Sequence, residues 1–276
     1  MIRYLRRFLA AAAMALALPA PAASTLTPDY SDLWLTLGEQ GWGVNIIQHY
    51  DTMFVTLFVY GPDNTARWYH GSAVRTVGAS QTQFSGELYV TTGSHFAQPW
   101  NPSVFSINSV GSISFNFPTP TTGTVSYSVS GQPSVTKSIV RHTLAANTLN
   151  GNYIGGVTAN GTNCRNGVQN GPILINGELT VSQSTFSQPT FRIDWFPSAT
   201  QTNTCTFRGT YAQEGRLGRL DGGTWSCTIP GVNNPPQGTF SLSQVEGTMT
   251  GFSGRFTGTD QNCDYNGFIG GTRDVL

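Results

Sequence analysis

Two short stretches decide the fold class: Ser-Ile-Ser-Phe-Asn-Phe at residues 112–117 and Val-Ser-Tyr-Ser-Val at residues 125–129. In both, apolar and polar residues alternate strictly, which is the period of a β-strand with one buried face. Gly123 lies between the two stretches, and glycine is a typical chain-breaking residue between strands. The two stretches therefore predict a pair of antiparallel strands.

The same pattern of short apolar runs divided by turn residues continues along the chain. After residue 22, no run longer than ten residues shows a helical apolar stripe. In the first half, strands are predicted at Val44–Gln48, Met53–Tyr60, Ala66–Val74, Phe84–Val90, Ser112–Phe117, Val125–Val129 and Val135–His142. In the second half, they are predicted at Tyr153–Val157, Ile173–Val181, Thr190–Trp195, Cys205–Tyr211, Thr224–Ile229, Thr239–Leu242, Thr248–Phe256 and Tyr265–Ile269.

Successive strands with local connections favour an up-and-down antiparallel barrel, because closure removes the exposed strand edges. We predict an all-β protein of two modules, residues 23–146 and 147–276, each an eight-stranded barrel of the calycin or avidin kind. A two-sheet β-sandwich is the alternative. A transmembrane barrel is disfavoured, because most predicted strands are shorter than the ten or so residues that it needs.

Charge is sparse, with 14 basic and 14 acidic residues making up 10% of the chain. A nucleic-acid partner is excluded, because phosphate binding needs clustered cations and the only lysine is Lys137. Aromatic residues account for 12% of the chain, which argues against disorder. The composition therefore predicts a folded β protein whose ligands are neutral.

The N-terminal residues are typical of an export signal. Arg3, Arg6 and Arg7 precede an apolar run at residues 8–18, and small residues follow it. We predict a signal peptide at residues 1–22, cleaved near Ala22, and a periplasmic or extracellular protein without a membrane span. Cleavage removes three arginines and no acid, so the mature chain carries three more acidic than basic residues.

Four cysteines lie in the second half of the chain, and an exported protein is expected to pair them as disulfides. Gly-Arg-Leu-Gly at residues 215–218 predicts a turn midway between Cys205 and Cys227, which would place these two opposite each other in a hairpin. We therefore predict Cys205–Cys227 and, by elimination, Cys164–Cys263.

Several motifs in the first half resemble a module that recurs in secreted proteins of Gram-negative bacteria, over roughly residues 29–143. They are Asp-Leu-Trp at 32–34, Glu-Gln-Gly-Trp-Gly-Val-Asn at 39–45, residues 51–60, Arg-Trp-Tyr at 67–69, residues 85–89 and Gln-Pro-Trp at 98–100. The module more often has Ser where this chain has Gln40, and often Trp where this chain has Leu35. The resemblance implies a secreted β module and no catalytic residue.

Two acidic residues are candidates for catalysis. Glu39 and Glu87 would suit a glycosidase if the fold held their carboxyl groups about 5–10 Å apart. The alternative is that they are solvent-facing acids near turns. No Gly-x-Ser-x-Gly elbow and no paired zinc-binding histidines accompany them.

Alternating oxygen ligands before Gly267 resemble part of a calcium loop. They are Asp260, Asn262 and Asp264, but Cys263 interrupts them and the spacing does not fit an EF-hand. A polar turn closing a hairpin is the favoured interpretation. No motif for a cofactor or nucleotide is present.

The first half also concentrates aromatic residues next to amides. Aromatic rings stack on sugars or line a small-molecule pocket, so these side chains are the candidate ligand-binding set. The set is Trp34, Trp42, Asn45, Trp68, Tyr89 and Trp100. The competing interpretation is that the rings fill the core of the barrel.

Three functions remain open from the sequence. The leading hypothesis is an exported, non-catalytic protein that binds a glycan or a small apolar molecule through the aromatic residues. The alternatives are a secreted hydrolase of polysaccharide or cell wall, and a structural or accessory surface protein whose partner is unknown.

Overall fold

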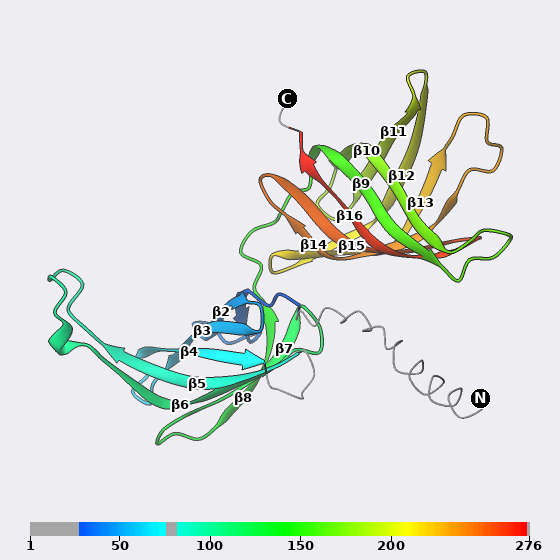
Figure 1. The fold of residues 1–276 in the computed structure, drawn as a ribbon. Coiled ribbons are helices and arrows are strands. Elements are labelled where there is room, and N and C mark those ends of the chain that lie inside the picture. Colours follow the sequence, from blue (N-terminus) through cyan, green and yellow to red (C-terminus); the bar gives the residue numbers. More distant parts are fainter. Residues whose placement is uncertain (1–27, 76–81, 275–276) are drawn as a thin grey trace, which may run out of the picture.

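The computed structural model describes residues 28–75 and 82–274, which form two closed antiparallel β-barrels joined by a short segment (Figure 1). The signal peptide predicted at residues 1–22 lies outside these ranges. Among the described residues, no helix is long and apolar enough to cross a membrane.

In the first barrel each strand pairs with the next one along the chain, and β1 also pairs with β8. Trp34 opposite Arg141 and Leu35 opposite Val140 make this closing pair. The strands are β1 (Asp32–Leu35), β2 (Gly43–His49), β3 (Thr52–Tyr60), β4 (Ala66–Arg75), β5 (Gln83–Thr92), β6 (Ser106–Asn116), β7 (Thr122–Val129) and β8 (Val135–Arg141), with a 3-10 helix, η1 (Pro102–Val104), between β5 and β6.

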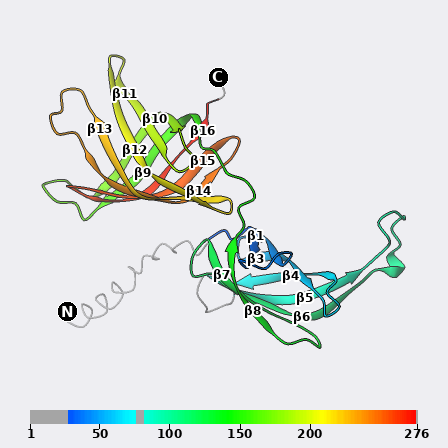
Figure 2. The same ribbon diagram turned by 180° about the vertical axis from the view of Figure 1, so that it is seen from behind.

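The second barrel has the same sequential order, and β9 closes it by pairing with both β10 and β16. Figure 2 shows both barrels from behind. The strands are β9 (Gly151–Thr162), β10 (Gly171–Gln183), β11 (Pro189–Ser198), β12 (Gln201–Glu214), β13 (Leu217–Thr228), β14 (Gln237–Gly247), β15 (Gly251–Asp260) and β16 (Asp264–Arg273).

The predicted fold class, two eight-stranded up-and-down barrels, is confirmed. The β-sandwich alternative is wrong, because each sheet closes on itself instead of packing face to face with another. The predicted boundary between residues 146 and 147 falls in the segment that joins β8 to β9.

Strands are longer than their apolar runs predicted. For example, β12 covers Gln201–Glu214, whereas the sequence predicted only Cys205–Tyr211. Outward-facing Thr and Gln side chains stay solvated, so the backbone ladder continues past the last buried residue. The short strand β1 was not among the predicted strands, since its four residues are too few for a clear alternation.

Alternation places one set of side chains in the lumen of each barrel. In β3, Met53, Val55 and Leu57 are fully buried, whereas Phe54 and Phe58 on the opposite face are exposed. Because lumen positions repeat every second residue, each barrel has one continuous apolar core.

Both predicted disulfides are present. Cys205 and Cys227 are register partners on β12 and β13 and form one bridge. Cys164 and Cys263 form the other and connect two loops at one end of the second barrel. Two disulfides fit an exported protein, because such bonds persist in oxidising compartments.

The barrels contact each other through the turn between β12 and β13. The backbone N–H of Gly215 donates to Thr143 Oγ1 at 2.9 Å, and that of Arg216 donates to Asp32 Oδ2 at 3.0 Å. The Arg216 side chain also donates from Nε to the carbonyl of Ser31 at 2.9 Å, and it forms an ion pair with Asp29 at 2.5 Å. Burial raises the pKa of Asp29, but hydrogen bonds from Ser31 and the charge of Arg216 outweigh it and lower the pKa.

Arg141 supports this contact from inside the first barrel. Its buried guanidinium donates to Asp32 Oδ2 at 2.9 Å and to the carbonyl oxygens of Pro120, Ser31 and Asp29. Burial lowers the pKa of Arg141, and the nearby carboxylate of Asp32 opposes that shift. The β12–β13 turn therefore docks on a preformed polar cluster.

Candidate functional site

Trp34 belongs to the core of the first barrel. Its side chain is 0% exposed, and its Nε1 donates to the carbonyl of Tyr30 at 2.9 Å. The ring packs 5.0 Å from that of Phe117. The prediction that Trp34 binds a ligand is wrong, because β1 directs this side chain into the lumen.

Trp42 is also a core residue, at 9% exposure. Its Nε1 donates to the hydroxyl of Tyr127 at 3.1 Å, and Lys137 Nζ lies 5.4 Å from the ring centroid. The neighbouring Gly41 has a φ of +81°, and a Cβ there would collide with Tyr60. The expectation that flanking glycines leave this ring approachable is therefore wrong.

Three of the predicted binding residues, Asn45, Trp68 and Tyr89, project from the outer face of β2, β4 and β5. Strand register aligns Asn45 with Thr56 of β3, Thr56 with His70 of β4, and His70 with Tyr89. Neighbouring strands lie about 4.8 Å apart, so these four side chains form a row across four strands.

Aromatic and apolar side chains flank this row on both sides. On one side Phe58 pairs with Trp68, and on the other Ile47 pairs with Phe54. Trp68 is 52% exposed, and both phenylalanines are exposed too. We call this surface the outer aromatic face; it comprises Ile47, Phe54, Phe58, Trp68, His70 and Tyr89.

His70 lies at the centre of the ring contacts on this face. Its ring centroid is 6.2 Å from that of Phe54, 5.8 Å from that of Trp68 and 5.9 Å from that of Tyr89. The planes of Phe54 and Tyr89 lie within 25° of the His70 plane. The contacts support one another and hold the rings in a defined arrangement.

A hydrogen bond fixes the edge of the face at β5. The hydroxyl of Tyr89 donates to Glu87 Oε2 at 2.7 Å, and this bond, with the charge of Glu87, raises the pKa of Tyr89. Glu87 pairs in register with Ser72, so carboxylate and hydroxyl groups border the rings. The surface therefore alternates rings with hydrogen-bonding groups.

Trp100 is exposed but lies outside this row. It belongs to the segment between β5 and β6, a long hairpin that extends beyond the first barrel (Figure 1). The ring is 64% exposed and packs 5.7 Å from the ring of Phe105. The sequence grouped Trp100 with Trp68, but the fold places them on different elements.

The two candidate catalytic carboxylates have separate partners. Glu39, in the loop before β2, forms an ion pair with Lys137 at 2.5 Å. Glu87 instead projects from the outer face of β5 and accepts the hydrogen bond from Tyr89. No hydrogen bond or ion pair connects Glu39 with Glu87 among the described residues.

The candidate calcium ligands shape a turn between β15 and β16. Asp260 Oδ1 accepts hydrogen bonds from the backbone N–H groups of Asn262 and Cys263, at 2.7 and 2.8 Å. Asn262 Oδ1 and Asp264 Oδ2 accept from the side chains of Asn166 and Asn163. Within residues 28–75 and 82–274, no group of three or more His, Cys, Asp or Glu side chains could hold a metal ion.

Sequence reasoning missed Phe54, Phe58 and His70 of the outer aromatic face. The available signal was that both sets of alternate positions in Met53–Tyr60 carry apolar residues. A half-buried strand needs only one apolar set, so a second set indicates a further contact surface.

No protein-family model and no curated protein matches the chain. Among solved structures, the chain is similar to the crystal structure of the isotype 1 transferrin binding protein B (TbpB) from serogroup B Neisseria meningitidis. The sequence identity is 9% and the TM-score is 0.25; the match covers 85% of this chain and 66% of the other. The chain thus spans less than two thirds of that protein.

Proposed function

We propose that this protein is an exported, non-catalytic binding protein whose first barrel binds a neutral glycan on the outer aromatic face. The observation that carries the proposal is the exposure of Trp68, Phe54 and Phe58 around His70, since none of these rings is needed to fill the barrel. Contiguous exposed apolar patches on a soluble protein mark interaction sites.

The chemistry of the face supports a sugar over a purely apolar ligand. A pyranose has an apolar C–H face that stacks on a ring, and hydroxyl groups around its edge that need hydrogen-bonding partners. The face supplies rings in Trp68 and Tyr89. An amide, a hydroxyl and a carboxylate lie beside it, in Asn45, Thr56 and Glu87.

Low charge supports a neutral ligand. The charged side chain that contacts a ring of this face is Glu87, which accepts the hydrogen bond from Tyr89. Charged residues make up only 10% of the chain. Recognition would therefore depend on stacking and hydrogen bonds, and binding would respond weakly to salt.

Export is part of the proposal. The predicted signal peptide at residues 1–22 and the two disulfides support a site outside the cytoplasm, in the periplasm or beyond the cell.

The proposal is tested with a glycan array probed by the purified protein, followed by titration of each hit with tryptophan fluorescence as the readout. Trp68→Ala is expected to weaken binding at least tenfold, because removing a central aromatic contact costs about 1.4 kcal/mol or more. Phe196→Ala is the matched control, since it removes an exposed ring of the second barrel.

Trp100→Ala distinguishes the outer aromatic face from the β5–β6 hairpin and is expected to leave glycan affinity unchanged. Binding that survives Trp68→Ala but is lost in Trp100→Ala would move the site to the hairpin. An array without a hit would reject the glycan and favour a structural role.

A further inference from the structure

The second barrel contains a cavity at the end that carries the loops at residues 163–170 and 229–236. Its volume is about 380 Å³. The walls are almost entirely apolar; they include Val157, Ile173, Ile175, Phe207, Trp225 and Phe256. The cavity opens at the mouth of the barrel, and apolar pockets of this size are typical of small-molecule sites.

The sizes of the lumen residues explain where the cavity lies. At the opposite end of the barrel, Tyr153 and Phe191 pack against Phe252, with ring centroids 5.0 and 5.8 Å from its own. At the cavity end, strands β9 and β10 contribute smaller aliphatic side chains to the wall, such as Val157 and Ile175. The barrel is thus filled at one end and left open at the other.

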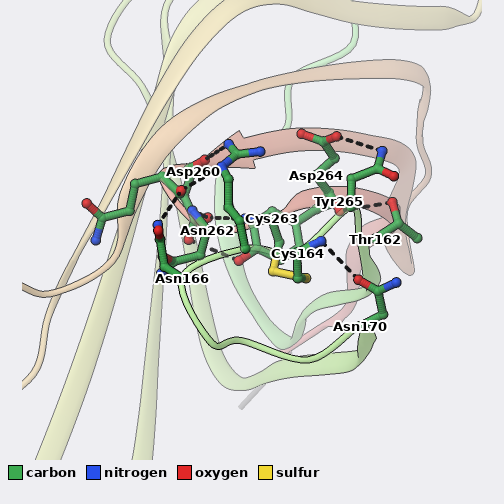
Figure 3. The surroundings of a disulfide bond; sticks show 12 residues. Thr162, Cys164, Asn166, Asn170, Asp260, Asn262, Cys263, Asp264 and Tyr265 are labelled. Carbon is green, nitrogen blue, oxygen red and sulfur yellow. Dashed lines mark hydrogen bonds between the residues drawn. A yellow bond between two sulfur atoms is a disulfide. The ribbon is translucent and has the colours of Figure 1, made fainter.

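Both disulfides lie at this end of the barrel. Cys227 of the Cys205–Cys227 bridge is a wall residue of the cavity. The Cys164–Cys263 bridge ties the β9–β10 loop to the β15–β16 turn, and Figure 3 shows the hydrogen bonds around it. The rim is therefore cross-linked before any ligand arrives.

Side chains reinforce the same rim. Arg165 donates to the carbonyl oxygens of Gln261 and Asp260, at 2.9 and 3.1 Å. Asn166 donates to Gln261 and Asn262 across the same gap. Holding a cavity mouth rigid lowers the conformational entropy that a ligand must remove on binding.

One polar group of the cavity wall lacks a partner. Trp225 is 7% exposed, and its Nε1 has no hydrogen-bond partner among the described residues. A Cβ at Gly238, the register partner of Trp225 on β14, would lie 2.9 Å from this nitrogen and would collide with the carbonyl oxygen of Thr259, so only glycine fits beside the Trp225 ring there. A buried N–H without an acceptor costs free energy, so an incoming acceptor oxygen would be favoured there.

The other polar groups at the rim are already satisfied. Tyr265 donates to Asp260 Oδ2 at 3.0 Å, and Asp260 Oδ1 accepts the two backbone N–H groups of the turn. Burial and the bond to Asp260 raise the pKa of Tyr265 to about 12, so this phenol stays neutral. Asp260 is the one charged side chain among the residues that line the cavity.

We propose that the second barrel binds a small, neutral, mainly apolar molecule in this cavity, with an acceptor oxygen of the ligand bound to Trp225 Nε1. The volume falls within the ~300–1,000 Å³ of typical ligand pockets and is more than twice the ~150 Å³ that accepts benzene. The site is separate from the outer aromatic face and does not depend on it.

Two neutral dyes test the proposal with the whole protein. Prodan carries a ketone oxygen on a naphthalene ring, and N-phenylnaphthylamine is of similar size but has no carbonyl group. Both are expected to bind saturably, one molecule per chain, with a Kd below about 100 μM. Ile173→Trp, which fills the cavity, is expected to weaken both dyes at least tenfold.

Ile154→Trp is the matched control, because Ile154 is exposed on the outside of β9, next to β10. It should leave both dyes unaffected, as should Trp68→Ala on the first barrel. Trp225→Phe keeps an aromatic ring but removes the N–H, and it is expected to weaken Prodan roughly fivefold while sparing N-phenylnaphthylamine.

The proposal fails if neither dye binds saturably. It also fails if binding survives cavity filling in a folded variant, or if Ile154→Trp abolishes binding as strongly as Ile173→Trp. Should Ile173→Trp fail to fold by circular dichroism, Ile175→Phe fills the same wall and is judged by the same criteria. Equal weakening of both dyes by Trp225→Phe would refute the bond to Nε1.

Discussion

Arg141→Met is expected to destabilise the first barrel strongly. The guanidinium is fully buried, 5.0 Å from the ring centroid of Trp34, and it neutralises Asp32, whose side chain is 9% exposed. Methionine retains an unbranched apolar chain that can pack on Trp34. The substitution would therefore remove the charge and its hydrogen bonds while retaining most of the packing.

The magnitude follows from burial. Removing one partner of a buried ion pair costs about 3–5 kcal/mol, because the other charge stays desolvated. At about 4 °C per kcal/mol for a domain of this size, the melting temperature should fall by about 12–20 °C. The carbonyl oxygens of Pro120 and Asp29 would also lose this donor, whereas the carbonyl of Ser31 would keep the hydrogen bond from Arg216 Nε.

Arg216→Met is the comparison, since Arg216 forms ion pairs with two partially exposed carboxylates. The side chains of Asp29 and Glu246 are 57% and 40% exposed. Pairs in such surroundings contribute about 0.2–1 kcal/mol each, so a fall of roughly 4 °C is expected. Thermal unfolding followed by circular dichroism measures both variants.

The ratio between the two variants tests the reasoning. Equal losses for Arg141→Met and Arg216→Met would show that burial does not control the cost. A loss below about 1 kcal/mol for Arg141→Met would show that the cluster tolerates an unpaired Asp32.

Three further predictions concern the backbone, the disulfides and the tyrosines. Gly215→Ala should destabilise the contact between the barrels, because φ is +66° and a Cβ would collide with Asp32 Oδ2. Gly131→Ala, with φ +78° and open space around it, should cost only about 1 kcal/mol in a urea titration. Replacing both cysteines of Cys164–Cys263 by alanine should lower the free energy of unfolding by about 4.7 kcal/mol, and the same change at Cys205–Cys227 by about 3.4 kcal/mol. The difference arises because the bridges close loops of 99 and 22 residues. Urea unfolding should rank the two variants in that order, and the reverse order would contradict the loop-entropy argument. Burial raises the pKa of Tyr30 and Tyr211 to about 12, so the folded protein keeps protons that the unfolded chain releases near pH 10. The urea concentration at the unfolding midpoint should therefore fall as the pH rises from about 10 to 12. An unchanged midpoint would mean that these phenols ionise freely in the folded state.

The strands and one turn were predictable because their causes are local. Ile113, Phe115 and Phe117 alternate with polar residues, and this pattern alone specifies a strand with a buried face. The turn at Gly215 was visible for the same reason, and it placed Cys205 opposite Cys227. That this turn would also dock on the first barrel was not visible, because its partners lie more than 70 residues away in the sequence.

The candidate sites were less predictable. The sequence does not distinguish Trp42 from Trp68, yet one is buried under Tyr127 and Lys137 and the other is exposed. In β4, aromatic residues occupy consecutive positions, so the sequence does not say which face is inside. Pairing with β3 decides it, by placing Tyr69 opposite the buried Leu57 and Trp68 opposite the exposed Phe58.

The sequence by itself therefore determined that this protein is built of antiparallel strands and which cysteines pair. Alternation and turn residues, on which both results depend, are properties of short stretches of the chain. The tertiary structure decided which aromatic rings form the outer face and which apolar side chains line the cavity of the second barrel. Both outcomes depend on strand register and barrel closure. Strand register and barrel closure are set by contacts between residues far apart in the chain, so the local sequence pattern does not predict them.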